Sequence, residues 1–147
     1  MEVTGGEPLI QQETPSLLAE LVKREYNVLL ETNGSLTLDS IPESVIKIVD
    51  IKTPGSREED SFLMENLKYI NNRDNIKFVI SHRRDFEWSR DFCTRHDLFA
   101  KADILFSSVE QLLDYQTLCK WILDENLNVR FQPQLHKLIW KNINQGV

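Results

Sequence analysis

The stretch Thr4-Gly5-Gly6-Glu7-Pro8, residues 4–8, is the point around which the rest of the chain is organised. Two adjacent glycines allow backbone dihedrals that are closed to other residues, and they let peptide N–H groups approach a ligand closely. The Glu7 carboxylate can accept a hydrogen bond from an ammonium group, and Pro8 favours the first turn of a helix. The same stretch also fits a plain strand-to-helix turn with Glu7 as a favourable N-terminal charge.

Beyond this turn, apolar runs and helical stripes alternate along the chain. Short β-branched runs predict strands at 28–30, 45–49, 76–80, 104–108 and 129–131. Apolar residues at helical spacing predict helices at 16–26, 62–70, 86–98, 109–126 and 135–144. No hairpin-type connection is visible, so the pattern predicts an α/β fold with a mostly parallel sheet flanked by helices. We expect one domain over residues 1–147.

The composition narrows the class of protein. The formal net charge of −6 and the pI near 5.1 argue against a nucleic acid or an anionic membrane as the main partner. The basic residues between 77 and 95 are interleaved with acidic ones, which is typical of a solvated face. The two cysteines are too few for a disulfide framework, and the sequence contains neither a signal peptide nor a membrane span. These features predict a cytoplasmic protein.

Three further polar stretches each follow an apolar run. They are Glu31-Thr32-Asn33-Gly34-Ser35, Asp50-Ile51-Lys52-Thr53-Pro54-Gly55-Ser56 and Gln132-Pro133-Gln134-Leu135-His136-Lys137. In parallel sheets of this kind, ligands bind at the carboxyl ends of the strands. The sequence therefore predicts that these stretches and residues 4–8 meet at one edge of the sheet.

This ordered set of motifs resembles the radical S-adenosylmethionine enzymes, and among them the 7-carboxy-7-deazaguanine synthase family. The resemblance extends from Val3 to Val147 and implies an incomplete (β/α) barrel. The family also carries an N-terminal strand and a loop whose three cysteines bind a [4Fe–4S] cluster. That loop has no counterpart here, so we expect the chain to correspond to the C-terminal two thirds of such an enzyme.

The resemblance implies roles for ten residues and assigns no catalytic or metal-binding residue. S-adenosyl-L-methionine contacts are implied for Gly5, Gly6, Glu7, Asn33, Asp50, Ile51, Lys52 and Gln134, and substrate contacts for Thr4 and the terminal carboxylate of Val147. Gln134 could equally meet the deazapurine edge, because an amide both donates and accepts. Ser35 is an alternative to Asn33 as the cofactor contact at its turn.

Simpler explanations exist for several of these residues. Asn33 and Gly34 are also typical of a turn that requires positive φ. Asp50 and Lys52 are opposite charges at the end of an apolar strand, which is costly unless they face a cleft or pair with each other. Cys93 and His96 have a spacing that could bind a metal, but no second pair of ligands accompanies them. The three tryptophans lie in helical patterns and are expected to serve in packing.

The resemblance implies an enzyme reaction that begins when S-adenosylmethionine is cleaved at the cluster. With the help of Mg²⁺, 6-carboxy-5,6,7,8-tetrahydropterin is then converted to 7-carboxy-7-deazaguanine, a precursor of queuosine. Two cysteines are too few to ligate a [4Fe–4S] cluster, so we expect this chain alone to be inactive. It could be an incomplete product, one half of a split enzyme, or a non-catalytic module that binds S-adenosylmethionine or a purine. The possible partners are a separate N-terminal half of the enzyme and a second copy of this chain in a homodimer.

Overall fold

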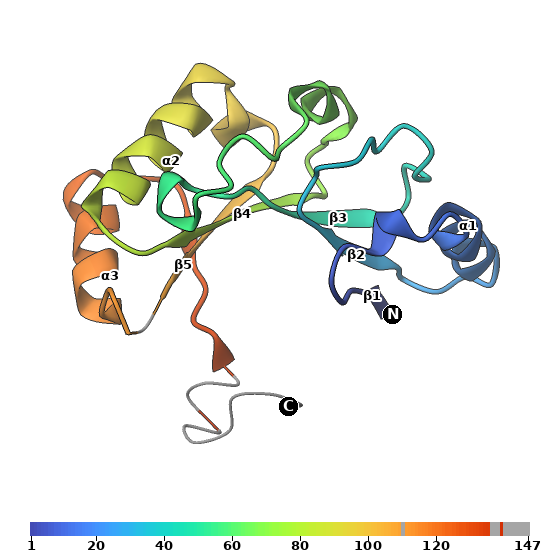
Figure 1. Ribbon diagram of the computed structural model, residues 1–147, viewed down its shortest axis with the longest axis horizontal. Coiled ribbons are helices and arrows are strands. Elements are labelled where there is room, and N and C mark those ends of the chain that lie inside the picture. The colour runs from blue at the N-terminus through green and yellow to red at the C-terminus, as the bar shows by residue number, and fades with distance from the viewer. Residues whose placement is uncertain (110, 136–138, 140–147) are drawn as a thin grey trace.

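Six strands form one sheet in which the spatial order is the order in the chain (Figure 1). They are β1 (Glu2–Val3), β2 (Leu29–Thr32), β3 (Ile46–Asp50), β4 (Asn75–Ile80), β5 (Asp103–Ser108) and β6 (Arg130–Phe131). The computed structural model describes residues 1–109, 111–135 and 139. Every neighbouring pair of strands is parallel, which confirms the predicted fold class. Within the described part, β1 and β6 each pair on one side only, so the barrel is open.

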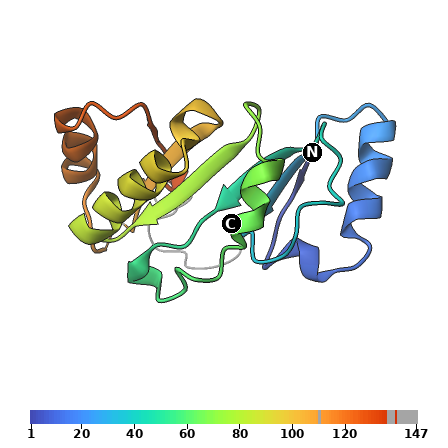
Figure 2. The same cartoon turned by 90° about the horizontal axis from the view of Figure 1, so that it is seen from above.

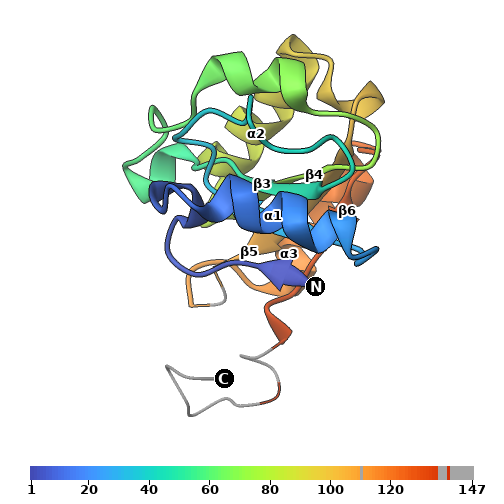
Figure 3. The same cartoon turned by 90° about the vertical axis from the view of Figure 1, so that its right-hand side faces the viewer.

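Helical segments lie in every connection between strands except that from β2 to β3, and the helices lie over one face of this sheet (Figures 2 and 3). The α-helices are α1 (Thr14–Lys23), α2 (Arg83–Arg95) and α3 (Tyr115–Asp124). Short 3-10 helices complete the connections: η1 (Pro8–Ile10), η2 (Pro54–Ser56), η3 (Met64–Tyr69) and η4 (Leu98–Ala100). None of these helices is both long and apolar enough to cross a bilayer.

The face of the sheet under the helices, here called the outer face, carries the hydrophobic core. Alternate strand residues such as Leu30, Val49 and Phe78 point to it and are fully buried. Phe78 and Phe106 are cross-strand neighbours whose rings meet edge-on, with centroids 5.8 Å apart. Burial of this face holds the strands in register, because a slip by one residue would expose the apolar set.

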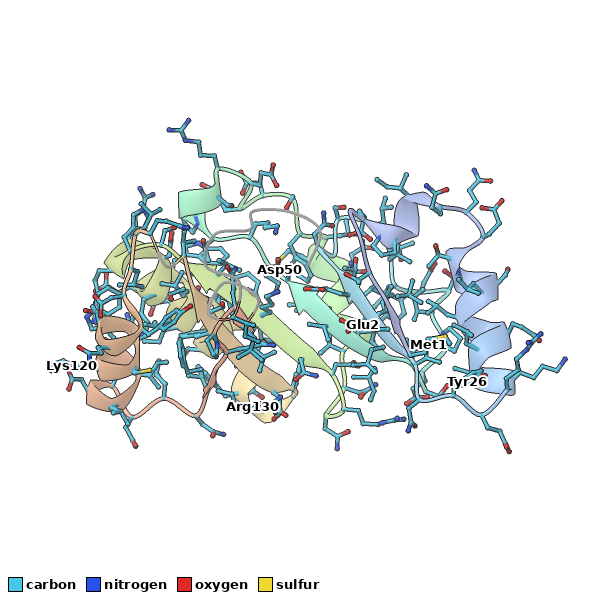
Figure 4. All side chains as sticks on the ribbon, turned by 90° about the horizontal axis from the view of Figure 1, so that it is seen from below. Met1, Glu2, Tyr26, Asp50, Lys120 and Arg130 are labelled. Carbon is cyan, nitrogen blue, oxygen red and sulfur yellow. The ribbon has the colours of Figure 1, made fainter. Side chains whose placement is uncertain are left out.

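The opposite, inner face is polar where the strands approach their carboxyl ends. The pairing register places Glu31 beside Ile48, and Asp50 beside Lys77, on this face. Figure 4 shows the inner face from below, with side chains including Asp50 projecting from the strands. No described helix covers it. In a barrel this face lines the interior, so the charges lie where a ligand of a barrel enzyme binds.

Some predicted elements differ from those observed. The helix expected at 62–70 is the 3-10 helix η3, and the helix expected at 109–126 is only Tyr115–Asp124. The second difference follows from Asp114, whose side chain caps α3 by accepting from the Thr117 backbone N–H at 2.9 Å. The predicted helix at 135–144 falls almost wholly outside the described residues.

The departure of η3 from the predicted α-helix has a cause in Asn66. This side chain is fully buried, and its Nδ2 donates to the carbonyl oxygens of Gly34 and Leu36, each at 2.9 Å. Its Oδ1 accepts from the backbone N–H of Leu38 at 3.0 Å. The segment is thus tied to the loop after β2, and its geometry follows those bonds rather than helical periodicity.

A buried ion pair lies at the amino end of the sheet. Lys47 Nζ is 3.0 Å from Asp74 Oδ2, and the two side chains are 3% and 0% exposed. Asp74 also accepts from the backbone N–H groups of Lys47 (2.8 Å) and Asn71 (2.9 Å). The carboxylate therefore joins the start of β3 to the turn before β4.

Candidate functional site

The carboxyl ends of β1, β2 and β3 meet around a cavity of about 260 Å³, the carboxyl-edge cavity. Its lining residues are Thr4, Gly5, Gly6, Glu31, Thr32, Asn33, Asp50 and Lys52. Six of the ten residues implicated by the sequence are in this set. Three of the predicted motifs therefore do converge, as expected for strand ends of a parallel sheet.

The two glycines form the turn after β1 with backbone dihedrals that other residues rarely adopt. Gly5 has φ +108° and Gly6 has φ +61°. A Cβ atom at either position would meet no atom within 4 Å, so the requirement for glycine is conformational rather than steric. Both glycines are exposed and line the cavity.

Glu7 does not line the cavity. Its carboxylate accepts from the hydroxyl of Thr32 at 2.9 and 3.0 Å and from the backbone N–H of Asn33 at 2.8 Å. It also caps η1 by accepting from the Leu9 N–H at 3.1 Å. Glu7 thus fastens the glycine turn to the end of β2, and direct contact with a cofactor stays a prediction.

Asn33 and Gly34 form the turn that the sequence suggested. Asn33 Oδ1 accepts from the Ser35 N–H at 2.9 Å, and Gly34 has φ +68°. A Cβ at Gly34 would lie only 2.7 Å from the Phe62 ring, so glycine is required there on both counts. The turn keeps the Asn33 side chain at the rim of the cavity.

Asp50 and Lys52 pair with each other and also line the cavity. The two charges therefore meet both conditions under which such residues are expected at the end of an apolar strand, pairing and exposure to a cleft. Lys52 Nζ donates to Asp50 Oδ2 at 2.9 Å, and the two side chains are 29% and 17% exposed. The second oxygen, Asp50 Oδ1, is buried without a hydrogen-bond partner in the described structure. Such an acceptor is costly, and a ligand donor in the cavity would satisfy it.

Glu31 and Lys77, for which the sequence predicted no role, form the centre of a hydrogen-bonded group on the inner face. Lys77 Nζ donates to Glu31 Oε1 at 2.9 Å, crossing over β3, and Thr4 Oγ1 donates to Glu31 Oε2 at 3.0 Å. Burial alone would raise the pKa of Glu31. The hydrogen bonds and charge of Lys77, helped by Thr4 and Lys52, instead hold that pKa below its usual value of 4.5.

We expect Glu31→Gln to change how stability depends on pH. Because the folded-state pKa of Glu31 is depressed, its stabilising contribution is complete above the unfolded value of 4.5 and is lost as pH falls through the folded value. The wild type should therefore exceed the variant in free energy of unfolding near neutral pH, and this difference should shrink in acid. Urea unfolding from about pH 3 to about pH 7 measures it.

The matched control is Glu13→Gln, since Glu13 is exposed and caps nothing with its side chain. Its difference from the wild type should stay small and nearly constant with pH. If Glu31→Gln followed the same flat profile, Glu31 would carry no depressed pKa.

A second tie holds the loop that follows Lys52. Asp85, fully buried in the first turn of α2, accepts from the Gly55 N–H at 2.8 Å and from the Ser81 hydroxyl at 2.7 Å and N–H at 3.0 Å. His82 Nδ1 lies 3.0 Å from the same carboxylate. A Cβ at Gly55 would come within 2.5 Å of Asp85 Oδ2. The loop after β3 is therefore clamped against the start of α2.

The remaining predicted residues lie apart from the cavity or outside the described part. Ile51 is fully buried on the outer face, and its backbone N–H donates to the Lys77 carbonyl at 2.9 Å. Gln134 follows β6, and its Oε1 is buried without a partner in the described structure. Val147 and His136 are outside the described residues.

The cysteines and the described histidines do not fit an iron–sulfur cluster or a metal. Cys93 is buried, and burial raises the pKa of its thiol to about 12, which disfavours the thiolate that ligates metals. Cys119 lies on another helix, α3. Within the described part of the chain, no group of three or more His, Cys, Asp or Glu residues could hold a metal ion.

Comparison with known proteins places these motifs in context. The chain is 41% identical to a 7-carboxy-7-deazaguanine synthase from Koribacter versatilis and 38% identical to one from Chlorobaculum tepidum. Each alignment covers 100% of this chain, and they cover 71% and 68% of the two relatives. No family model matches the chain.

Two solved structures share the fold. QueE from Escherichia coli matches with a TM-score of 0.69 at 20% identity, over 89% of this chain and 55% of that one. SuiB from Streptococcus suis matches with a TM-score of 0.61 at 16% identity, over 99% of this chain and 42% of that one. The chain thus spans about half the length of these proteins, and at such identities the likeness is one of fold.

Proposed function

Because the chain belongs to the 7-carboxy-7-deazaguanine synthase family of radical S-adenosylmethionine enzymes, we propose that its carboxyl-edge cavity binds S-adenosylmethionine beside a pterin-type substrate. The observation that carries the proposal is the meeting of the glycine turn, Asn33, Asp50 and Lys52 at one cavity. On this proposal the protein is part of an enzyme that makes 7-carboxy-7-deazaguanine from 6-carboxy-5,6,7,8-tetrahydropterin.

The donors and acceptors of the cavity suit the amino-acid group of S-adenosylmethionine. The unpaired Asp50 Oδ1 would accept from an ammonium, and Lys52, 2.9 Å from the other oxygen of Asp50, would attract a carboxylate. The backbone carbonyl groups of the exposed residues Gly5 and Gly6 would offer further acceptors. The amino-acid group of the cofactor is a zwitterion, so it would bind where an acceptor and a cation lie side by side. The ligand would then compensate the cost of burying the charges of Asp50 and Lys52 in the cleft.

The carboxyl-edge cavity would hold only part of the cofactor. A cavity of about 260 Å³ is smaller than the roughly 300–1,000 Å³ of most ligand sites. The rest of the cofactor would extend over the inner face, where Thr4 and Glu31 would orient the substrate. Bound S-adenosylmethionine supplies the hydrogen-abstracting chemistry, and the protein supplies binding and orientation.

The described residues offer no fitting ligands for the cluster that cleaves the cofactor in this family. We propose that the cluster, and the Mg²⁺ of the family, are ligated outside the described residues, and that the chain alone binds the cofactor without turnover. The proposal of a binding site is thereby separable from catalysis and can be tested directly.

Calorimetric titration with S-adenosylmethionine tests the site, and we expect saturable binding by the wild type. Lys52→Ala should weaken the affinity by at least about tenfold, because the carboxylate loses its cation and Asp50 is left with an unpaired charge. Asp50→Asn should weaken it similarly. The matched control is Lys23→Ala at the exposed end of α1, which should bind as the wild type does.

Absence of binding by a chain shown to be folded would remove the cavity as the cofactor site. Equal affinity of the Lys52→Ala variant and the wild type would leave binding intact but would refute the assignment of Lys52.

A further inference from the structure

A second, larger cavity lies on the outer side of the sheet. This outer pocket has a volume of about 560 Å³ and is lined by residues of α2 and of the segment that leads into η3. Its lining residues are Ile51, Glu59, Asp60, Phe62, Met64, Trp88, Asp91, Phe92, Arg95 and His96. None of these residues lines the carboxyl-edge cavity, so the outer pocket is a separate feature.

The floor of the outer pocket is aromatic. Trp88 and Phe92, one turn apart on α2, stack with ring centroids 5.1 Å apart, and Phe92 meets His96 at 4.6 Å. Phe62 closes the floor from the other side, 6.4 Å from Phe92. Aromatic surfaces of this kind contribute large contact area at low entropic cost, as in the anchor pockets of protein interfaces.

Exposed apolar side chains lie at the edge of the outer pocket, where Met64 is one of the lining residues. Met64 is 44% exposed, and its neighbour Leu63 is 37% exposed. A polypeptide segment that runs along this edge would bury both Met64 and Leu63. Exposed apolar surface next to a polar rim is typical of sites where another protein binds.

The rim of the outer pocket is acidic. Three carboxylates, from Glu59, Asp60 and Asp91, stand against the single guanidinium of Arg95. In the described structure Asp91 pairs with Arg90 at 2.7 Å, while Glu59 and Asp60 have no ion-pair partner. Burial, together with the charges of Arg95 and Lys101, lowers the pKa of His96 and so favours the neutral imidazole. Glu59 and Asp60 are therefore free to pair with cations of a partner.

We propose that the outer pocket is a docking site for a basic amphipathic segment of a partner protein. One apolar side chain of the segment rests on Trp88 and Phe92 and extends to Met64. Lysine or arginine residues beside it pair with Glu59 and Asp60. Complementary charge on the two sides sets the orientation and speeds the encounter. The proposal does not depend on the cofactor site, which lies on the other face.

The probe for this proposal is a fluorescein-labelled amphipathic peptide with leucines on one face and lysines and arginines on the other. Fluorescence anisotropy with the full chain should give saturable binding that weakens as salt is added. Replacing the basic residues of the peptide by glutamate should abolish binding. The double variant Glu59→Lys/Asp60→Lys should weaken binding at least about tenfold, and Met64→Asp should weaken it by about fivefold or more.

The matched control reverses two exposed acids elsewhere, Glu13→Lys/Glu43→Lys, and should bind within about twofold of the wild type. In ¹⁵N spectra the Trp88 indole N–H, assigned with Trp88→Phe, should shift on addition of the basic peptide. The proposal is overturned if the folded wild type does not bind, if both charge-reversed proteins bind equally, or if the Trp88 signal stays in place. Affinity for S-adenosylmethionine should be unchanged in the rim variants, which separates the two proposals.

Discussion

An alanine in place of Asp74 is expected to lower the free energy of unfolding by about 3–5 kcal/mol, as is usual when one partner of a buried ion pair is removed. The substitution leaves Lys47 charged and 3% exposed, with only the Val45 carbonyl at 3.4 Å as an acceptor. It also removes the acceptor of two backbone N–H groups. Urea unfolding followed by circular dichroism measures the loss.

Lys47→Met and Asp39→Ala are the two comparisons for this prediction. Lys47→Met removes the cation but leaves Asp74 with its two backbone donors, so its cost should be smaller than that of Asp74→Ala. Asp39 is exposed, and its replacement by alanine should change stability by less than about 0.5 kcal/mol. A loss below about 1 kcal/mol for Asp74→Ala would mean that the pair is not a main stabiliser of the amino end.

Asp85→Ala is expected to affect both stability and cofactor binding. The side chain accepts from Gly55 and Ser81, so its removal leaves buried donors unsatisfied, at about 1–3 kcal/mol for each donor that finds no water. The loop after Lys52 loses its anchor. We expect a loss of at least about 2 kcal/mol in stability and at least about tenfold in S-adenosylmethionine affinity.

Urea unfolding and calorimetry on the same variant separate the two effects. Asp91→Ala, on the same helix, is the control, because Asp91 is exposed and pairs only with Arg90 in the described structure. Gly55→Ala should reproduce the loss of affinity by a different route, since its Cβ would displace the loop from Asp85. A folded Asp85→Ala protein that bound the cofactor normally would show that the clamp does not position Lys52.

The sheet and three of its strand-end motifs could be predicted because both depend on local patterns. An apolar run followed by polar residues is visible in the sequence, and parallel order then brings successive carboxyl ends together. The pair of charges at Asp50 and Lys52 was informative for the same reason. The buried, unpaired oxygen of Asp50 could not be foreseen, since it depends on how the strands pack around it.

Contacts between distant residues were not visible in the sequence. Lys77 interrupts an apolar strand, and the alternation of side chains along a strand predicts that it points to the face opposite to that of Phe78. Its partner Glu31, however, is 46 residues away in the sequence. Lys47 interrupts a strand in the same way and yet points to the buried face, where Asp74 receives it. A charged residue within an apolar strand therefore indicates that it has an oppositely charged partner, but it does not indicate on which face of the sheet the pair lies.

The order of the strands has a consequence for how the chain folds. Paired strand residues are between 17 positions apart (Leu29 with Ile46) and 28 positions apart (Asn75 with Asp103). Each strand therefore finds its neighbour in the segment synthesised immediately before it, and closing a loop of this length costs less entropy than pairing strands from opposite ends of the chain. Because N-terminal segments emerge first from the ribosome, the sheet can grow strand by strand in the direction of translation.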